Sequence, residues 1–381
     1  FININMNFQL TDEQKLIQKT AKDFSDNELA PGAVERDQKK EWPEKAIREM
    51  GCLGFMGMMV DPEWNGGGMD TVSYAIAMEE IARSDASASV VMSVNNSLVC
   101  YLLQKYASDF LKDNYLKDLA SGEKLGAFSL SEPQSGSDAS NMLTTAKKED
   151  DSYIINGTKN WVTNGLSSDY VIVFAITKQG IGHKGISCFL VDKKYDGFEV
   201  GKPEDKLGIR SSDTTELYFD NVKVPKENLI GEEGGGFKIA LSTLDGGRIG
   251  IASQALGIAQ ASLNKSIEYS KERYQFNKPI AANQAIQNKL ANMAIEIESC
   301  RLLIYKAAWL KDNQKDFGVA ASMAKVYASE VAMRASTECV QIHGGYGYIA
   351  ETGVERLMRD AKITQIYEGT SEIQRVVIAR G

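Results

Sequence analysis

The first third of the chain carries the hydrophobic period of α-helices. Thr11 and Gln14 form a capping-box pattern, and apolar residues recur after it at helical spacing. Pro43 suits a first helical turn. Similar stretches predict helices at about 70–82, 86–105 and 108–120, the first of them after a glycine-rich turn at 65–68. We therefore expect residues 1–121 to form an N-terminal α-helical domain.

After Gly122 the pattern changes to that of β-strands. β-branched and aromatic residues now alternate with polar ones between frequent turn residues. The alternation predicts strands near 126–130, 152–155, 170–177, 186–191 and 215–219. The pair Asn156-Gly157 predicts a two-residue β-hairpin turn. We expect residues 122–231 to form a middle β domain, a small sandwich or barrel.

The helical period returns after Phe237. Long stretches predict helices at 238–273, 285–312 and 319–342, and four such helices packed antiparallel would form a bundle. Several glycines lower the helix propensity of the first stretch, so the close approach of a ligand or another helix is expected there. These glycines are Gly246, Gly247, Gly250 and Gly257. Residues 232–381 are expected to form this C-terminal domain, and the fold class is mostly α with a central β domain.

Length and charge narrow the function classes. The 381 residues exceed one comfortable hydrophobic core, which favours several packed domains. A net charge of −8, with lysines and arginines scattered among acidic residues, argues against nucleic acid as a partner. Apolar runs such as 171–176 are too short to span a bilayer, so no membrane partner is expected. Residues 1–5, before Met6, lack the basic and apolar regions of a secretion signal and are interpreted as a short tail.

Cysteine and histidine are sparse. The 5 cysteines are widely spaced without a pairing pattern, which favours a reducing compartment. The 2 histidines, His183 and His343, are too few for a metal site or a His-centred triad. We therefore expect no metal, and chemistry that depends on carboxylates or on a bound cofactor.

Residues 180–185, Gly-Ile-Gly-His-Lys-Gly, match the glycine pattern of dinucleotide-binding loops. That function requires a strand before the loop and a helix after it, whereas a strand is predicted to follow here. A hairpin loop is the better interpretation, which argues against a nicotinamide-binding Rossmann domain.

Two segments of the middle region suit a planar or phosphorylated ligand. The loop 128–138 is rich in hydroxyl groups that bind polar rings or phosphates, although such a loop is more often only a capped turn. Trp161 stands two residues before Thr163, so both side chains would lie on one strand face. This spacing suits a ligand stacked on Trp161 and bonded by Thr163, with a core tryptophan as the simpler alternative.

The C-terminal part holds the candidate base. Glycines in the segment 341–347 permit close contact with a ligand, or simply end the preceding helix. Glu368 follows Ile366-Tyr367 and precedes Gly369. An apolar setting would raise the pKa of Glu368 and suit it as a general base, whereas a single glutamate is usually an ordinary surface residue.

Together and in this order, these segments resemble the acyl-CoA dehydrogenase family over nearly the whole chain. Residues 128–138 resemble the first family signature, and residues 341–347 through Arg356 and Asp360 resemble the second. Segments 244–257 and 366–375 are similar to those of short-chain, butyryl-CoA dehydrogenases. Departures from the pattern are small, at Ser129 and Asn141. Isovaleryl-type members carry their base near Gln254, where this chain has no acid, so the resemblance implies Glu368 as the base.

The resemblance implies non-covalent FAD in a site completed by a neighbouring subunit of a homo-oligomer, a tetramer built as a dimer of dimers. The residues implied around the flavin ring are Phe128, Leu130, Ser131, Trp161 and Thr163. Those implied at the pyrophosphate and adenosine are Arg273, Phe276 and Gln284, with Gln341, Gly344 and Gly345 from the neighbouring subunit, and Thr370 and Glu372 would complete the site.

The implied reaction dehydrogenates the α,β bond of a short-chain acyl-CoA, from butyryl-CoA to crotonyl-CoA. Glu368 would accept the α-proton and flavin N5 the hydride, and electrons would pass to an electron-transferring flavoprotein. The residues implied along the substrate path are Ser137, Asp245, Arg248 and Gly369, with Gln254 and Thr364 at the far end of the acyl pocket. The many Lys, Asn and Ile residues favour a bacterial cytoplasm over a mitochondrial matrix.

Three alternatives stay open. An oxidase of the same fold would pass electrons to oxygen, but it would have a longer C-terminal architecture than this sequence shows. A non-catalytic flavin- and CoA-binding protein would lack the base at Glu368. An enoyl-CoA reductase would use the same residues in the reverse direction.

Overall fold

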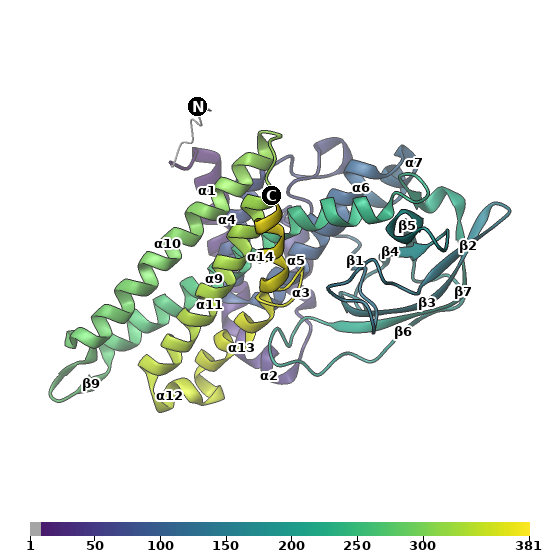
Figure 1. Cartoon of the computed structure of the whole chain (residues 1–381). Coiled ribbons are helices and arrows are strands. Elements are labelled where there is room, and N and C mark those ends of the chain that lie inside the picture. Colours follow the sequence, from purple (N-terminus) through teal and green to yellow (C-terminus); the bar gives the residue numbers. More distant parts are fainter. Residues whose placement is uncertain (1–8) are drawn as a thin grey trace.

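The computed structural model describes residues 9–381, so the expected tail at residues 1–5 lies outside the described part of the chain. Helices form the first and last parts of the chain, and a β-sheet lies between them. In Figure 1 the strands of this sheet lie together at one side of the molecule, and the long helices extend toward the other. This arrangement confirms the predicted mostly-α fold with a central β domain.

Side-chain caps begin several helices of the N-terminal part. The α-helices of this part are α1 (Asp12–Phe24), α2 (Ala33–Lys39), α3 (Glu44–Cys52), α4 (Thr71–Ser84), α5 (Ala86–Ser93), α6 (Tyr101–Tyr106), α7 (Asp109–Leu111) and α8 (Lys117–Ser121), of which α1, α4, α5 and α7 have side-chain caps. The Thr11 side chain accepts from the Gln14 N–H, and the Gln14 side chain accepts from the Thr11 N–H, so the predicted capping box is confirmed. Asp70 and Asp85 cap α4 and α5 with their carboxylates.

The continuous helical stretch Ala86–Tyr106 runs through α5, the π-helical turns Val94–Cys100, and α6. This stretch is long and apolar enough to cross a membrane. Only shorter apolar runs were considered in the sequence, so this stretch was not identified there. Yet 94% of its most apolar 18-residue window is buried inside the protein. Such burial is typical of a core helix.

The strands join in one sheet of 8 strands with the order β6-β7-β3-β2-β4-β5-β8, and β1 pairs in parallel with β4. Their bounds are β1 Gly126–Ser129, β2 Thr145–Glu149, β3 Ser152–Thr163, β4 Tyr170–Ile176, β5 Ile186–Asp192, β6 Phe198–Val200, β7 Thr214–Pro225 and β8 Leu229–Ile230. The loop at 180–185 joins the antiparallel strands β4 and β5, which confirms its interpretation as a hairpin loop.

The hairpin predicted at Asn156-Gly157 is wrong. Both residues lie inside β3, which continues beside β7 beyond them. Gly157, at a φ of +150°, marks a shift in the pairing register with β7, and a side chain there would meet Thr144. The turn between β2 and β3 falls earlier, where Asp150 adopts a φ of +49°. Gly157 therefore forms part of a β-bulge and not of a turn.

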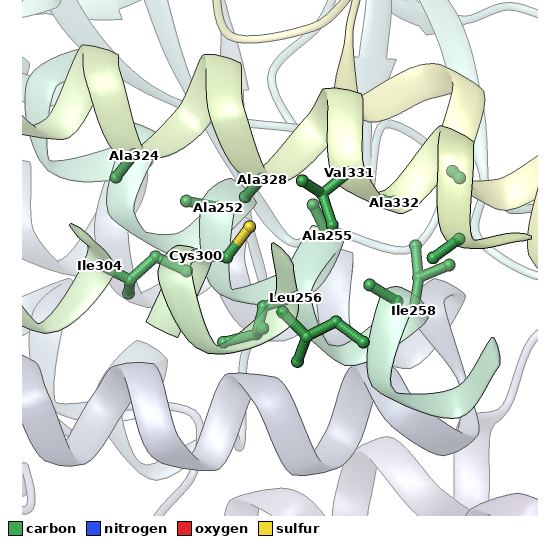
Figure 2. Close-up of a cluster of buried hydrophobic side chains, with 14 of the residues drawn as sticks. Ala252, Ala255, Leu256, Ile258, Cys300, Ile304, Ala324, Ala328, Val331 and Ala332 are labelled. Carbon is green, nitrogen blue, oxygen red and sulfur yellow. The ribbon is translucent and has the colours of Figure 1, made fainter. Parts of the chain in front are cut away.

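The C-terminal helices share one apolar core. They are α9 (Gly236–Glu272), α10 (Gln284–Asp312), α11 (Gly318–His343), α12 (Gly345–Tyr348), α13 (Val354–Thr364) and α14 (Ser371–Arg380), with a short hairpin of β9 (Tyr274–Gln275) and β10 (Lys278–Pro279) after α9. In Figure 2, Cys300 of α10 lies among Leu256 of α9 and Ala328 of α11, all of them buried. Small side chains at these contacts let the helices approach closely.

The middle of α9 packs against α4, α11 and α13, and so lies at the junction of the two helical parts. A side chain at Gly257 would lie 2.7 Å from the Ala82 Cβ of α4, so another helix does approach at this glycine, as predicted. Burial on several sides explains why α9 shows no strong apolar stripe. The candidate catalytic residues gather around this part of α9.

Candidate active site

Glu368 lies in a tight turn between α13 and α14. The Tyr367 N–H still donates to the Ile363 carbonyl at the end of α13, whereas Thr370 already caps α14 through its hydroxyl group. Between them the backbone is left-handed, with a φ of +53° at Glu368 and +92° at Gly369. A glycine adopts this conformation freely, but a glutamate does so at a cost and is often found this way at functional sites.

Two side chains hold the backbone of this turn. The Gln374 amide donates to the carbonyl oxygens of Glu368 at 3.1 Å and Gly369 at 3.0 Å. The ammonium group of Lys325, from α11, donates to the same Gly369 oxygen at 2.7 Å. These bonds fix the direction in which the Glu368 side chain leaves the chain.

The Glu368 carboxylate points into the protein. Part of the residue is accessible, but its Oε2 is buried without a hydrogen-bond partner. Burial raises the pKa of Glu368 to about 7, against the opposing charges of Lys325 and Arg248. The prediction of a raised pKa is thus confirmed, and the alternative of an ordinary surface glutamate is wrong.

A glycine on α9 makes room for this carboxylate. A Cβ at Gly247 would overlap Glu368 Oε2 and would lie 2.8 Å from a methyl carbon of Leu98. At the next glycine on this face, Gly250, an added Cβ would lie 2.6 Å from the Tyr74 hydroxyl oxygen. Glycines 247 and 250 therefore allow the base and its polar neighbours to approach the helix axis.

Arg248 and Asp245 lie one helical turn apart on α9. The Arg248 guanidinium donates to Asp245 at 2.6 Å and to the Ser322 hydroxyl of α11 at 3.1 Å, while its Nε is buried without a partner. Burial lowers the pKa of Arg248 and raises that of Asp245, and the attraction between the two groups opposes both effects. The structure thus pairs the two predicted substrate residues on α9 and places the charge of Arg248 near Glu368, whereas Ser137 is an exposed residue of the loop 128–138.

Gln254 and Thr364 are fully buried. The Gln254 amide donates to the Ala86 carbonyl at 2.8 Å and to Ser89 at 2.9 Å, and its oxygen accepts from the Tyr367 hydroxyl. The Thr364 hydroxyl donates to the Ala361 carbonyl at 2.7 Å. Gln254 is therefore linked through Tyr367 to the residue beside the base, and Thr364 is satisfied within its own helix.

A buried ion pair joins the loop 128–138 to strand β3. The Lys159 ammonium, with no exposed surface, bonds Glu132 at 2.8 Å and the Leu130 carbonyl at 3.2 Å. The Asn160 N–H donates to the Ser131 carbonyl at 2.9 Å. The predicted flavin-ring residues of the loop are therefore held against the strand that carries Trp161 and Thr163, and Phe128 packs on the ring of Phe174 at 5.1 Å.

Trp161 is not a core residue. It is 62% exposed and adopts a φ of +59°, at a register shift between Lys159 and Val162. The alternative of a core tryptophan is therefore wrong. The same bulge interrupts the strict alternation from which Trp161 and Thr163 were expected to share a face.

Most of the remaining predicted cofactor residues lie near the C-terminal end of α9. A surface cavity of about 580 Å³ is lined there by Arg273, Gly344 and Gly345, together with Tyr269, His343 and Tyr346. Gln284 and Gln341 are exposed, and so is Phe276 at 92%, on the β9–β10 hairpin. Thr370 and Glu372 instead belong to the start of α14, beside Glu368.

Two groups of the predicted residues therefore lie far apart. Roughly 25 residues of α9 separate Arg248 from Arg273, which corresponds to about 37 Å at a helical rise of about 1.5 Å per residue. One group surrounds Glu368, and the other surrounds Arg273.

Three family models match consecutive parts of the chain. They describe the acyl-CoA dehydrogenase N-terminal domain at residues 11–123, the middle domain at 127–222 and the C-terminal domain at 234–381. The chain belongs to the acyl-CoA dehydrogenase family. The predicted family and enzyme class, an oxidoreductase acting on CH–CH bonds, are confirmed.

Individual acyl-CoA dehydrogenases are close in sequence and structure. The chain is 49% identical to the mitochondrial short-chain specific enzyme of Rattus norvegicus, over 97% of this chain and 90% of that one. Butyryl-CoA dehydrogenase from Megasphaera elsdenii has a TM-score of 0.97 at 49% identity, over 98% of this chain and 99% of that one. A chain in a structure described as the electron transferring flavoprotein of Acidaminococcus fermentans has a TM-score of 0.97 at 47% identity, over 98% and 99%.

Sequence reasoning missed two side chains next to the base of this acyl-CoA dehydrogenase. Lys325 is fully buried on α11, where the only sequence signal is a lysine among alanines and serines. Tyr74 of α4 bonds the Ser97 hydroxyl at 3.1 Å, and burial raises its pKa to about 12. In the described residues no group of three or more His, Cys, Asp or Glu is arranged to hold a metal ion.

Proposed function

We propose that this acyl-CoA dehydrogenase oxidises short-chain acyl-CoA thioesters, converting butyryl-CoA to crotonyl-CoA, with Glu368 as the acceptor of the α-proton. The observation that carries the proposal is the Oε2 atom of Glu368, which is buried without a hydrogen-bond partner in a carboxylate whose pKa burial raises to about 7. A base is most effective when its pKa lies near the working pH. The short-chain and butyryl-CoA relatives support the choice of substrate.

The chain supplies the parts that proton abstraction needs. The left-handed turn aims the carboxylate at the space left by Gly247, where its Oε2 is buried near Leu98. Near pH 7, with a pKa of about 7, roughly half of the Glu368 groups are ionised and ready to accept a proton. The Arg248–Asp245 pair and Gly369 are proposed to line the path of the thioester, with Ser137 at its outer part.

The acyl pocket is proposed to end at Gln254 and Thr364. The amide of Gln254 is already tied to α5 and to Tyr367, so an apolar chain that reached it would have to break buried hydrogen bonds. This cost favours short acyl chains over long ones.

Two features fit FAD. The exposed ring of Trp161, beside a loop fixed by a buried ion pair, offers a surface for a planar group, and Phe128, Leu130, Ser131 and Thr163 are proposed to border it. At the second group, nothing lies within 4 Å of a Cβ at Gly344 or Gly345, and the guanidinium of Arg273 suits a pyrophosphate. FAD, when bound, supplies the hydride acceptor, flavin N5.

The separation of the two groups supports a shared cofactor site. The group around Arg273, with Phe276, Gln284 and Gln341, lies about 37 Å along α9 from Arg248 at the helical rise. We propose that one copy of the chain contributes the residues around Glu368, and a second copy contributes those around Arg273. The enzyme is accordingly proposed to be a homo-oligomer, and specifically a tetramer. Its proposed location is a bacterial cytoplasm.

An electron-transferring flavoprotein is the proposed electron partner. The strong structural match to a chain described with such a flavoprotein supports this choice. Reduction of crotonyl-CoA by the same residues is the second candidate direction. Turnover of crotonyl-CoA with the reduced flavoprotein, compared with turnover of butyryl-CoA with the oxidised one, distinguishes the two directions.

The proposal is tested by a visible absorption titration of the purified holoenzyme with acyl-CoAs of increasing chain length. We expect rapid bleaching of the flavin band by the four-carbon substrate, weaker bleaching by long chains, and loss of bleaching in Glu368→Gln. Glu13→Gln, an exposed carboxylate on α1, serves as the control for charge. Full bleaching in Glu368→Gln would contradict the role of Glu368.

A further inference from the structure

Lys325 is a buried cation that the proposed reaction does not yet use. Its side chain has no exposed surface, which is rare for a lysine without a charged partner. Its ammonium group bonds the Gly369 carbonyl at 2.7 Å. In the part of the chain that the structure describes, it forms no direct ion pair, although the Glu368 carboxylate is the largest charge acting on it.

A purely structural role explains this lysine poorly. The Gly369 carbonyl already accepts from the Gln374 amide at 3.0 Å, so the turn does not need a second donor to satisfy that oxygen. An ammonium group in an apolar interior is costly, and an apolar side chain would fill the same space at lower cost. A nearby negative charge is required to offset that cost, and Glu368 provides it.

We propose that Lys325 is a positioning residue for Glu368: its ammonium group fixes the Glu368–Gly369 turn through the Gly369 carbonyl and places an uncompensated positive charge facing the carboxylate. The proposal rests on the proposed role of Glu368 as the base and adds the group that controls its ionisation.

Of the other groups that face Glu368, only Arg248 adds positive charge, and its effect is smaller than that of Lys325. On α9, Arg248 lies beside Asp245 at 2.6 Å, so much of its charge is offset locally. On α4, the Tyr74 hydroxyl is neutral because burial raises its pKa to about 12. Next to the base, burial keeps Tyr367 neutral as well. On α14, Glu372 is exposed and negative.

The sign of the effect follows from the charges. Burial raises the pKa of Glu368, and the charge of Lys325 opposes that rise. Removal of the charge therefore raises the pKa of Glu368 further, by about one pH unit for an opposite charge at this range. From a pKa of about 7, the ionised fraction at pH 7 would fall from about half to about one tenth, so kcat/KM at pH 7 would fall about fivefold.

Two substitutions separate the charge from the hydrogen bond. Lys325→Gln removes the charge but keeps an N–H donor for the Gly369 carbonyl, whereas Lys325→Met removes both. Lys311→Met is the matched control, because burial also lowers the pKa of Lys311 to about 8 but its charged neighbours are Asp312 and Lys105. Since loss of a lone buried charge relieves desolvation, the Lys325 variants are expected to fold, which circular dichroism checks.

Two measurements on the holoenzymes test the proposal. The pH profile of kcat/KM reports the base during turnover, and infrared difference spectra against the matching Glu368→Gln protein report its ionisation without turnover. We expect both Lys325 variants to raise both midpoints by about one pH unit, with Lys311→Met unchanged. We also expect Lys325→Met to lower the kcat of the ionised enzyme more than Lys325→Gln, because only the former loses the bond to the turn.

Unshifted midpoints in both folded Lys325 variants would overturn the proposal. Failure of the proposed function looks different. In that case acyl-CoA would not bleach the flavin of the unsubstituted enzyme, while the infrared midpoint of Glu368 would still depend on Lys325.

Discussion

A single missing side chain determines whether the Glu368 carboxylate fits into the protein. Gly247 leaves the space that Oε2 occupies, whereas a Cβ at its neighbour Gly246 meets nothing closer than the Lys311 ammonium at 3.5 Å. Both glycines lie within α9, where each lowers helix stability. Of these two glycines, only Gly247 is required by the active site, because only there would a side chain meet the Glu368 carboxylate.

This contrast gives a matched pair of variants. Gly247→Ala should displace the Glu368 carboxylate and lower kcat by at least about tenfold, because a displacement of about 1 Å at a reacting group has effects of that size or larger. Gly246→Ala should keep activity and stabilise α9 by about 0.5–1 kcal/mol, since alanine is the better helix former. Steady-state kinetics and thermal unfolding of both proteins check this. Equal activity in the two variants would contradict the steric argument.

The sequence could predict Glu368 but not its surroundings. A glutamate next to Gly369 within a family-like segment was visible in the sequence, and so were the glycines of α9. Lys325 was not, because a lysine on a helix is normally exposed and its burial depends on packing between α11 and the distant turn. The identity of the base is local information, whereas its electrostatic environment arises from tertiary contacts.

At the scale of elements, strand β3 and the loop 128–138 behave as one unit. Lys159 and Glu132 are 0% and 2% exposed, and the Glu132 carboxylate also accepts from the Thr144 N–H at 3.1 Å. Loss of one partner from a buried ion pair leaves the other charge without compensation. The loop that is proposed to border the flavin therefore depends on this pair for its position.

Glu132→Gln tests that dependence. It should destabilise the protein by about 3–5 kcal/mol, as is typical when one partner of a buried pair is removed, and it should lower the flavin content per chain. Glu149→Gln, in the exposed pair with Lys147, should cost less than about 1 kcal/mol and leave flavin content unchanged. The ratio of flavin to protein absorbance, measured with thermal unfolding, compares the two. Normal flavin content in Glu132→Gln would exclude the proposed coupling.

Strand boundaries show where sequence patterns fail at this scale. The helices and most strands were predicted because their hydrophobic periods are local. The pair Asn156-Gly157 predicted a turn, but its partners on β7 extend the strand through it and turn the glycine into a bulge. The exposure and the left-handed backbone conformation of Trp161 depend on the same pairing, so the sequence pattern did not predict them either. Pairing with a strand more than 50 residues away is not encoded near either residue.

At the scale of the whole molecule, the length of α9 separates the two groups of predicted cofactor residues. The 37 residues of this helix extend from the neighbourhood of Glu368 to the cavity at Arg273. The hairpin beyond it presents Phe276, which is 92% exposed, to the outside. A large exposed aromatic beside a glycine-lined cavity is the kind of surface that a second copy of the chain would cover.

Subunit complementation tests whether two copies share one site. Glu368→Gln and Arg273→Ala should each inactivate the enzyme alone, the first by loss of the base and the second by loss of cofactor binding. In a mixed dimer, the intact Glu368 of one chain meets the intact Arg273 of the other at one of the two sites, so the doubly purified fraction of a closed two-fold assembly should show about half of full activity. Co-expression with two affinity tags, followed by flavin content and activity of the doubly purified fraction, measures this recovery. Inactive mixed assemblies that nevertheless contain both chains would place the whole cofactor site within a single chain.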